Sequence, residues 1–276
     1  MLRSRVLTAV VLLGGFLACV FLLPHAAFAA LAGLVATLAA WEWARLASFG
    51  GAARYAFATA CALVYVLLGS TLGAQHVDQT ASAALYGVAT GFWLFVAPAW
   101  LARGVRLESR LLAVAIGALV IIPAALALAG LRDYSPALLL ASLALVWIAD
   151  SAAYFVGRRF GRRKLAPAIS PGKTWEGVAG GLAASVAYAI ILALAAPPGL
   201  PAAQGFAWAG YVLIAVLLCG LGVVGDLFES AVKRRAGVKD SGSLLPGHGG
   251  VLDRIDSATS TLPAAALALF VYSRWA

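Results

Sequence analysis

Nine stretches of about 20 mostly apolar residues follow one another along this chain. They are Val6–Leu23, His25–Ala44, Tyr55–Gly73, Ala81–Leu101, Leu111–Leu131, Ala137–Val156, Gly177–Ala196, Phe206–Gly225 and Ala258–Trp275. Each is long enough to cross the hydrocarbon core of a bilayer as a helix. The alternation of polar and apolar residues typical of membrane barrels is absent, so we expect an all-α fold.

The supply of charge agrees with this fold class. Charged residues make up 11% of the chain and hydrophobic residues 63%, whereas a soluble domain carries about 25% charged residues. The chain therefore has too few charges to cover a surface that faces water. We predict a polytopic integral membrane protein with about nine transmembrane helices and membrane lipid as its main solvent.

The basic residues indicate the direction in which the spans run. If the N-terminus lies in the cytoplasm, 18 of the 20 Lys and Arg residues fall on the cytoplasmic side, and only Arg132 and Arg274 fall outside. Cytoplasmic loops of membrane proteins are enriched in Lys and Arg. This accounts for much of the net charge of +9 without any binding of nucleic acid, and it predicts a cytoplasmic N-terminus.

Most of the polar chemistry lies in the second half of the chain. Seven of the 11 acidic residues lie from Asp150 onward, and two long cytoplasmic segments, Arg158–Glu176 and Glu229–Ser257, also carry glycines and bases. We therefore divide the chain into residues 1–135, with five scaffold spans, and residues 136–276, with four spans and these two segments. We call Arg158–Glu176 and Glu229–Ser257 the first and second reactive segments. We expect both parts to form one compact unit.

The end of the eighth span carries a polar helix face. Asp226, Glu229, Ser230 and Lys233 stand at positions i, i+3, i+4 and i+7, so a helix places them on one side. An acid near a membrane span is a functional candidate. A simple interfacial pair between Asp226 and Lys233 explains the pattern equally well.

A glycine-rich segment with spaced acids and bases follows. Gly249 and Gly250 allow the backbone to approach an anion, and Asp253 and Asp256 face the same way if the chain is helical there. With Asp226 they form a set of oxygen donors suited to Mg²⁺, which is commonly coordinated by carboxylates and phosphate oxygens together. Bases that can neutralise a polyphosphate are Lys233, Arg234, Lys239 and Arg254. A solvated topogenic loop would explain the bases alone.

The first reactive segment also suits an anion. Lys173 stands beside a predicted helix start that Ser170 and Thr174 can cap, and such a start attracts anions. The Gly-Lys-Thr sequence at this point lacks the upstream glycine and the strand of a P-loop. Asp150 and Tyr154 share a face of the preceding span. Glu42, between two tryptophans, is interpreted as part of an interfacial belt.

These residues resemble a known signature. The pattern is Ser230-x-x-Lys233-Arg234-x4-Lys239-Asp240-x-Gly242-x2-Leu245-Pro246-x-His248-Gly249-Gly250-x-x-Asp253-Arg254-Ile255-Asp256. It resembles the signature of the phosphatidate cytidylyltransferases, also called CDP-diacylglycerol synthases. Asp150–Gly161 and Ser170–Gly177 resemble a second region of that family. The resemblance is specific over Asp150–Asp256 and general over the first five spans.

The resemblance implies transfer of a cytidylyl group from CTP to phosphatidate, with pyrophosphate as the leaving group. It also implies Mg²⁺, with two ions as one option, potassium as a further cation, a homodimer, and a bacterial inner membrane location with the site facing the cytoplasm. We predict Asp226, Asp253 and Asp256 as metal ligands that act with Lys233 in catalysis. Predicted substrate-binding residues are Asp150, Tyr154, Ser170, Lys173, Thr174, Arg234, Lys239, Asp240, His248, Gly249, Gly250 and Arg254.

Two other functions compete with this one. A different membrane transferase that uses CTP or a polyprenyl phosphate would share the acids and bases without needing the whole signature. A transporter for an anion would place charged residues or broken helices near the middle of the bilayer. In this chain the acids gather at the predicted cytoplasmic ends instead, with Asp150 a partial exception.

Overall fold

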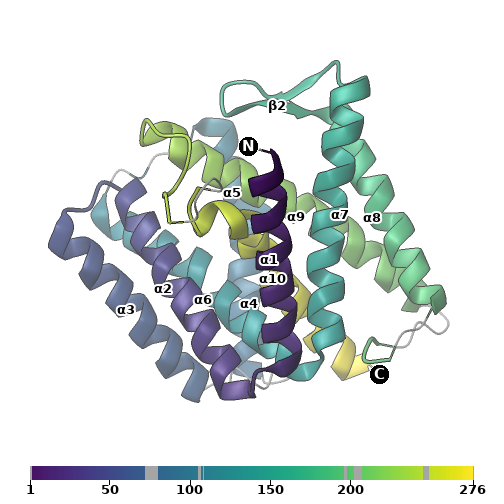
Figure 1. Ribbon diagram of the computed structural model, residues 1–276, viewed down its shortest axis with the longest axis horizontal. Helices are drawn as coiled ribbons and strands as arrows, with labels where there is room; N and C mark the ends of the chain where they lie inside the picture. Colours follow the sequence, from purple (N-terminus) through teal and green to yellow (C-terminus); the bar gives the residue numbers. More distant parts are fainter. Residues whose placement is uncertain are drawn as a thin grey trace.

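The structure is a computed structural model that describes residues 2–71, 80–104, 107, 109–195, 198–201, 207–244 and 249–275. Its elements are α1 (Leu2–Leu22), α2 (His25–Leu46), α3 (Gly51–Thr71), α4 (Thr80–Gly91), the π-helix η1 (Phe92–Val96), α5 (Ala97–Arg103), α6 (Arg110–Tyr134), α7 (Pro136–Phe160), β1 (Lys164–Ala166), β2 (Ser170–Thr174), α8 (Trp175–Ala195), α9 (Ala207–Arg235) and α10 (Leu252–Trp275). Figure 1 shows a helical bundle with one small hairpin at its edge.

The helices confirm the predicted fold class. Within the described residues, eight helical segments are long and apolar enough to cross a membrane, and they match the second to ninth predicted spans. The first prediction corresponds to α1, whose apolar described part is Leu13–Leu22. The fourth span consists of α4, η1 and α5 in succession, so it crosses as one helix with a π-turn just before Pro98.

Two reactive segments have more structure than the sequence predicted. The eighth span does not end at Gly225, because α9 continues to Arg235 and Asp226 lies inside the helix. The segment Arg158–Glu176 is not a simple loop, since β1 and β2 pair antiparallel within it. Short hairpins of this kind give no hydropathy signal, and apolar patterns locate the membrane-embedded part of a helix rather than its water-facing end.

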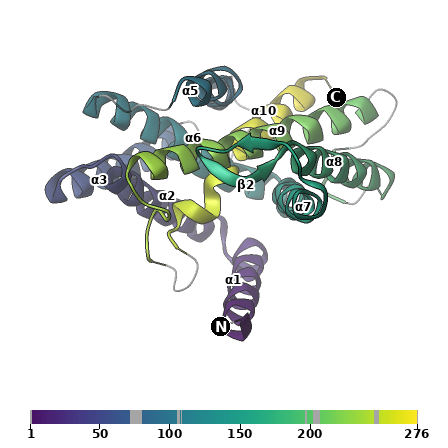
Figure 2. The same cartoon turned by 90° about the horizontal axis from the view of Figure 1, so that it is seen from above.

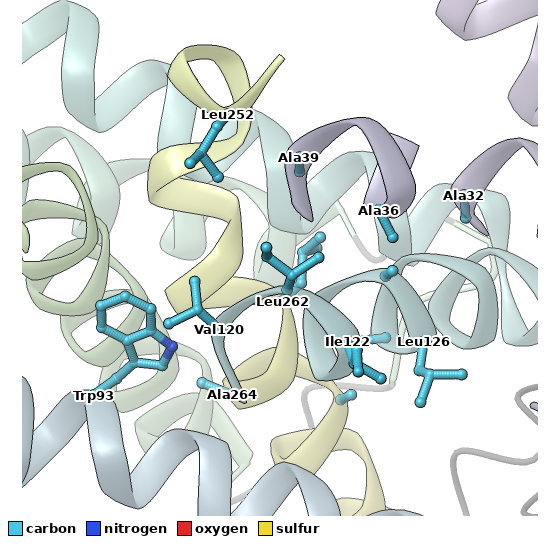
Figure 3. Close-up of a cluster of buried hydrophobic side chains, with 14 of the residues drawn as sticks. Ala32, Ala36, Ala39, Trp93, Val120, Ile122, Leu126, Leu252, Leu262 and Ala264 are labelled. Carbon is cyan, nitrogen blue, oxygen red and sulfur yellow. The ribbon is translucent and has the colours of Figure 1, made fainter. Parts of the chain in front are cut away.

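The core joins the two halves of the chain. Helix α6 packs against α2 and also against α10, and Figure 3 shows side chains of all three in one apolar cluster, among them Ala36, Val120 and Leu262. Trp43 of α2 is buried, stacks on Phe228 of α9 and donates a hydrogen bond from Nε1 to the carbonyl of Ala113. The N-terminal spans are therefore in direct contact with the helices that carry the signature.

The two termini lie at opposite ends of the bundle (Figure 1). The chain's N-terminus and the hairpin lie at one end, and the C-terminus lies at the opposite end (Figure 1). At this second end, Arg132 donates to the carbonyls of Val20 and Leu23 at the turn between α1 and α2. Helix α1 stands at the outer edge of the bundle (Figure 2), where Phe16 meets Trp147 of α7 edge-on. This arrangement suits an odd number of crossings.

Candidate active site

Four helices and the hairpin surround a cavity of about 920 Å³. The helices are α7, α8, α9 and α10, and the hairpin is β1–β2. Nine of the predicted site residues line it, namely Asp150, Tyr154, Ser170, Lys173, Thr174, Asp226, Asp253, Arg254 and Asp256. Lys164 and Arg158 add further positive charge. The cavity therefore holds carboxylates and bases together, as a site for a metal-bound or multiply charged anion requires.

Close packing of α7 on α8 forms one wall of the cavity. A Cβ on Gly177 would lie 2.8 Å from the carbonyl oxygen of Ala153, and one on Gly181 would lie 2.8 Å from that of Ala149. Only residues without a side chain allow this approach of two backbones, which is a common means of packing membrane helices. The wall places Asp150 of α7 in the cavity, next to the contact between Ala149 and Gly181.

The hairpin delivers Lys173 into the cavity. Thr174 caps α8, because its Oγ1 accepts a hydrogen bond from the Gly177 N–H at 3.1 Å, as predicted. Glu176 accepts from the backbone N–H groups of Arg162 and Arg163 and so ties α8 to the end of α7. The prediction that Ser170 also caps the helix is wrong, since Ser170 begins β2 and pairs with Ala166.

Asp226 forms an ion pair with the hairpin rather than with its own helix. Lys173 Nζ lies 2.6 Å from Asp226 Oδ2, and Ser230 Oγ donates to the other carboxylate oxygen at 3.2 Å. The proposed interfacial pair of Asp226 with Lys233 is therefore wrong. Asp226 and Lys173 are both partly exposed, at 29% and 24%, so the pair faces the cavity and can exchange partners with an incoming anion.

Lys233 lies behind the cavity, between two buried carboxylates. Its ammonium is 2.6 Å from Asp253 Oδ1 and 3.0 Å from Glu229 Oε1, and the exposed fractions of all three side chains are between 5% and 11%. Glu229 forms an ion pair with Lys233. Neither of its oxygens has a hydrogen-bond partner among the described residues. The spacing of Glu229 from Asp226 and Lys233 predicts its helix face correctly but indicates no role for it.

Asp253 closes the loop that precedes α10. Its Oδ2 accepts hydrogen bonds from the backbone N–H groups of Ser241 and Gly250, each at 2.8 Å, while Oδ1 faces Lys233. Both ends of the loop are thereby fixed to a single carboxylate in the first turn of α10. The expectation that Asp253 and Asp256 lie on a helix and face the same site is confirmed.

A second carboxylate reaches the same loop from the N-terminal half. Glu42 of α2 is fully buried, and it accepts hydrogen bonds from Ser241 Oγ, the Val251 N–H and the Leu252 N–H at 2.8–3.0 Å. Its interpretation as part of an interfacial belt is wrong. A charged residue inside an apolar span was the signal that could have found it, because such residues are costly unless they are partnered.

The other predicted substrate-binding residues that the structure describes lie outside the cavity wall. Arg234 is exposed and donates to the carbonyls of Ile169 and Val238, which places it at the edge of the hairpin. Lys239 and Asp240 are exposed, and the carbonyl of Asp240 accepts from Arg45 at 3.3 Å. Gly249 and Gly250 belong to the loop held by Asp253. The predicted phosphate-binding residue His248 lies outside the described residues.

Replacing Gly250 by alanine tests how closely the loop is packed. The added Cβ would lie 2.2 Å from Ser241 Oγ and 2.4 Å from Glu42 Oε2, so the loop must move away from both. A displacement of about 1 Å near reacting groups can lower a rate on the order of 100-fold, and we expect a loss of this size in the turnover of the purified protein. Gly220→Ala is the control, since its Cβ would contact nothing within 4 Å and the residue does not line the cavity, so turnover should stay at the wild-type value.

The oxygen donors around the cavity fit a divalent cation that is coordinated by the protein and by a substrate together. Asp150, Asp226 and Asp256 all present carboxylates to the same space. In the part of the chain that the structure describes, no three acidic, His or Cys residues converge into a ready metal cluster. Mg²⁺ usually takes one or two carboxylates and completes its shell with waters and phosphate oxygens. The site therefore suits Mg²⁺ together with a phosphate ligand better than it suits a metal held by protein alone.

Comparison with known proteins agrees with this chemistry. The profile of the cytidylyltransferase family matches residues 3–272. A phosphatidate cytidylyltransferase of Pseudomonas aeruginosa is 42% identical in an alignment that covers 98% of this chain and 97% of that protein. The chain belongs to the phosphatidate cytidylyltransferase family. A member from Haemophilus influenzae is 38% identical over 95% of this chain and 96% of its own length.

Other members of the family match a shorter stretch more closely. The phosphatidate cytidylyltransferase of Bacillus subtilis is 46% identical over 46% of this chain and 45% of its own length. That of Brucella suis is 52% identical over 47% of this chain and 44% of that protein. The family assignment by the signature residues is thus confirmed over nearly the full chain by two relatives and over about half of it by others.

Proposed function

We propose that this chain transfers the cytidylyl group of CTP to phosphatidate in a bacterial inner membrane, with the described cavity facing the cytoplasm. The observation that carries the proposal is the convergence of Lys173, Asp226 and Asp256 on one cavity in a chain that matches the family over residues 3–272. Phosphatidate lies in the leaflet and CTP in the cytosol, so a site at the polar end of the helices can receive both.

The reaction needs orientation more than it needs a base. An oxygen of the phosphatidate phosphate attacks the α-phosphorus of CTP, the new P–O bond forms the diphosphate of CDP-diacylglycerol, and the bond to the β-phosphate breaks to release pyrophosphate. The attacking oxygen is already anionic, so no proton has to be removed. Holding the two phosphates in line and neutralising their charge is then the main task of the protein.

We assign the bases of the cavity to the phosphates. Lys173 lies in contact with Asp226 and can turn to a phosphate without leaving the cavity, while Arg254 and Lys164 line the same space. Lys233 instead keeps Asp253 in place and neutralises a buried carboxylate. Asp150 and Tyr154 of α7 also line the cavity. We assign their side of the cavity to the entry of the lipid phosphate.

A divalent cation belongs to the proposal as well. When bound, Mg²⁺ supplies positive charge to the triphosphate and to the pyrophosphate that leaves. Asp226 and Asp256 would hold it, and two ions or an additional K⁺ are compatible with the number of carboxylates in the cavity. Asp253 was predicted as a third ligand, and it engages both of its oxygens with Lys233, Ser241 and Gly250 here. Its metal role stays a prediction, to be tested with Asp253→Asn in a titration of Mg²⁺.

The deciding assay uses the purified chain in detergent. Labelled CTP, dioleoyl phosphatidate and Mg²⁺ should yield labelled CDP-diacylglycerol and pyrophosphate, and omission of phosphatidate should abolish the lipid product. Chelation of the divalent cation by EDTA should stop the reaction, and added Mg²⁺ should restore it. A folded sample that forms no lipid product with any phosphatidate would contradict the proposal, whereas product formation that resists EDTA would contradict only the metal.

Two further parts of the proposal concern orientation and assembly. The N-terminus and the hairpin lie at the end opposite the C-terminus (Figure 1), so a reporter fused behind α10 should report an extracytoplasmic position. A cytoplasmic reading there would reverse the orientation.

The homodimer is tested by light scattering of the detergent-solubilised protein, where a mass of one chain would remove that prediction.

A further inference from the structure

We infer that Glu42 is a positioning residue for the active site, although it lies in the N-terminal half of the chain and does not touch the cavity. In this view its carboxylate holds the loop before α10, and the loop in turn sets the positions of Asp253 and Asp256. The inference rests on the proposed function, because it concerns the geometry in which that reaction occurs.

The first observation is how completely Glu42 is engaged. Its side chain is 0% exposed, Oε1 accepts from the Val251 N–H at 3.0 Å, and Oε2 accepts from the Leu252 N–H and from Ser241 Oγ at 2.8 Å each. The two N–H groups belong to the start of α10, where the helix dipole favours a negative charge. A buried carboxylate with three donors is a strong and directional anchor.

The shape of the loop depends on this carboxylate. A Cβ on Gly242 would lie 2.2 Å from Glu42 Oε1, and one on Gly250 would lie 2.4 Å from Oε2. The backbone therefore wraps around the carboxylate more closely than any residue with a side chain would permit. Glu42 thus explains why two positions of the signature are glycine, although it lies 199 residues before Ser241 in the sequence.

The contacts run without a break from Glu42 to the cavity. Ser241 donates its hydroxyl to Glu42, accepts from the Asp253 N–H at 3.3 Å, and donates its own N–H to Asp253 Oδ2 at 2.8 Å. Val251 and Leu252, which also bond to Glu42, directly precede Asp253. Figure 3 shows Leu252 of α10 and Ala39 of α2, one turn before Glu42, in the same apolar cluster. Release of Glu42 would therefore shift the start of α10, the helix that carries two of the cavity's four acids, Asp253 and Asp256.

Glu42→Gln keeps the size of the side chain and removes the charge. In either amide orientation the new NH₂ group faces a backbone N–H donor, of Val251 or of Leu252, so at least one bond is replaced by a repulsive contact. We expect kcat to fall on the order of 10–100-fold, while the KM for phosphatidate changes less than about 2-fold. Hydrogen exchange of the Val251 and Leu252 amides should become faster, with no change in α3.

Thr37→Val is the matched control. Thr37 lies on the same helix, and its hydroxyl donates only to the carbonyl of Gly33 within α2, so both turnover and exchange should stay at the wild-type values. If Glu42→Gln fails to fold, Ser241→Ala decides instead, because it removes only the hydroxyl link between Glu42 and Asp253. We expect Ser241→Ala to lower kcat about 10-fold and to speed exchange at the same amides.

The outcomes separate the inference from the function on which it rests. An active wild type with a Glu42→Gln variant of unchanged kcat and unchanged exchange would overturn the positioning role alone. Faster exchange throughout the protein, with a matching loss of thermal stability and no specific fall in kcat, would show a purely structural glutamate and overturn it too. An inactive, folded wild type would overturn the proposed function, and the positioning role with it.

Discussion

Asp256→Asn is expected to lower turnover of CTP by roughly 10²–10³-fold while leaving the protein folded. Asp256 lines the cavity, and one of its carboxylate oxygens accepts a hydrogen bond from the Ser257 N–H at 2.7 Å. The carbonyl oxygen of asparagine can keep this bond, so the local structure has no reason to change. What is lost is the negative charge that faces the cavity, and with it a candidate ligand for Mg²⁺.

The measurement is kcat and KM for CTP in detergent, together with the thermal unfolding midpoint of each sample. Asp133→Asn is the matched control, because this acid pairs with His25 at 2.5 Å at the end of the bundle opposite the hairpin. It should retain activity within about 2-fold, because this partly exposed pair contributes little and lies far from the cavity. Near wild-type turnover of Asp256→Asn at saturating Mg²⁺ would remove Asp256 from the reaction.

The spans and the location of the site could be predicted from the sequence because both depend on local composition. Apolar runs of about 20 residues report the bilayer directly, and the eight long helices and α1 follow them. The acids and most of the signature glycines of the second half likewise fall in a few short segments, Asp150–Gly161, Ser170–Gly177 and Asp226–Asp256. Nine of the predicted site residues, from Asp150 to Asp256, do line one cavity.

Pairings between distant segments could not be predicted in this way. A Trp-Glu-Trp sequence near a helix end has the same local pattern whether it faces headgroups or a buried loop, and only the fold shows that Glu42 meets Leu252. One of the two interpretations of Asp226 pairs it with Lys233, which is correctly spaced on the same helix, but the hairpin supplies Lys173 instead. Local periodicity gives the face of a helix and not what the face contacts.

Lys233→Met is expected to have the largest effect on stability of the changes considered. The ammonium is buried between Glu229 and Asp253, so its removal leaves two buried carboxylates without a countercharge. Breaking a buried ion pair from one side costs about 3–5 kcal/mol. Asp253 would also lose the contact that orients Oδ1, so turnover should fall on the order of 100-fold or more.

The thermal unfolding midpoint and kcat should be measured for this variant beside Arg274→Met. Arg274 is an exposed base at the far end of α10 that contacts Thr80 and Phe270, and its loss should cost less than about 1 kcal/mol and leave turnover unchanged. A Lys233→Met protein as stable as the control would mean that Glu229 and Asp253 are not both charged in the folded state.

The double variant Lys233→Met with Glu229→Gln distinguishes stability from catalysis. Neutralising Glu229 removes one of the two unpaired buried charges, so part of the lost stability should return. Turnover should stay low, because Asp253 still lacks its ammonium partner and Glu229 lies outside the cavity wall. If the double variant recovered activity together with stability, Lys233 would act only through the integrity of the fold. If stability returned without activity, the ion pair of Lys233 with Asp253 would be part of the catalytic geometry.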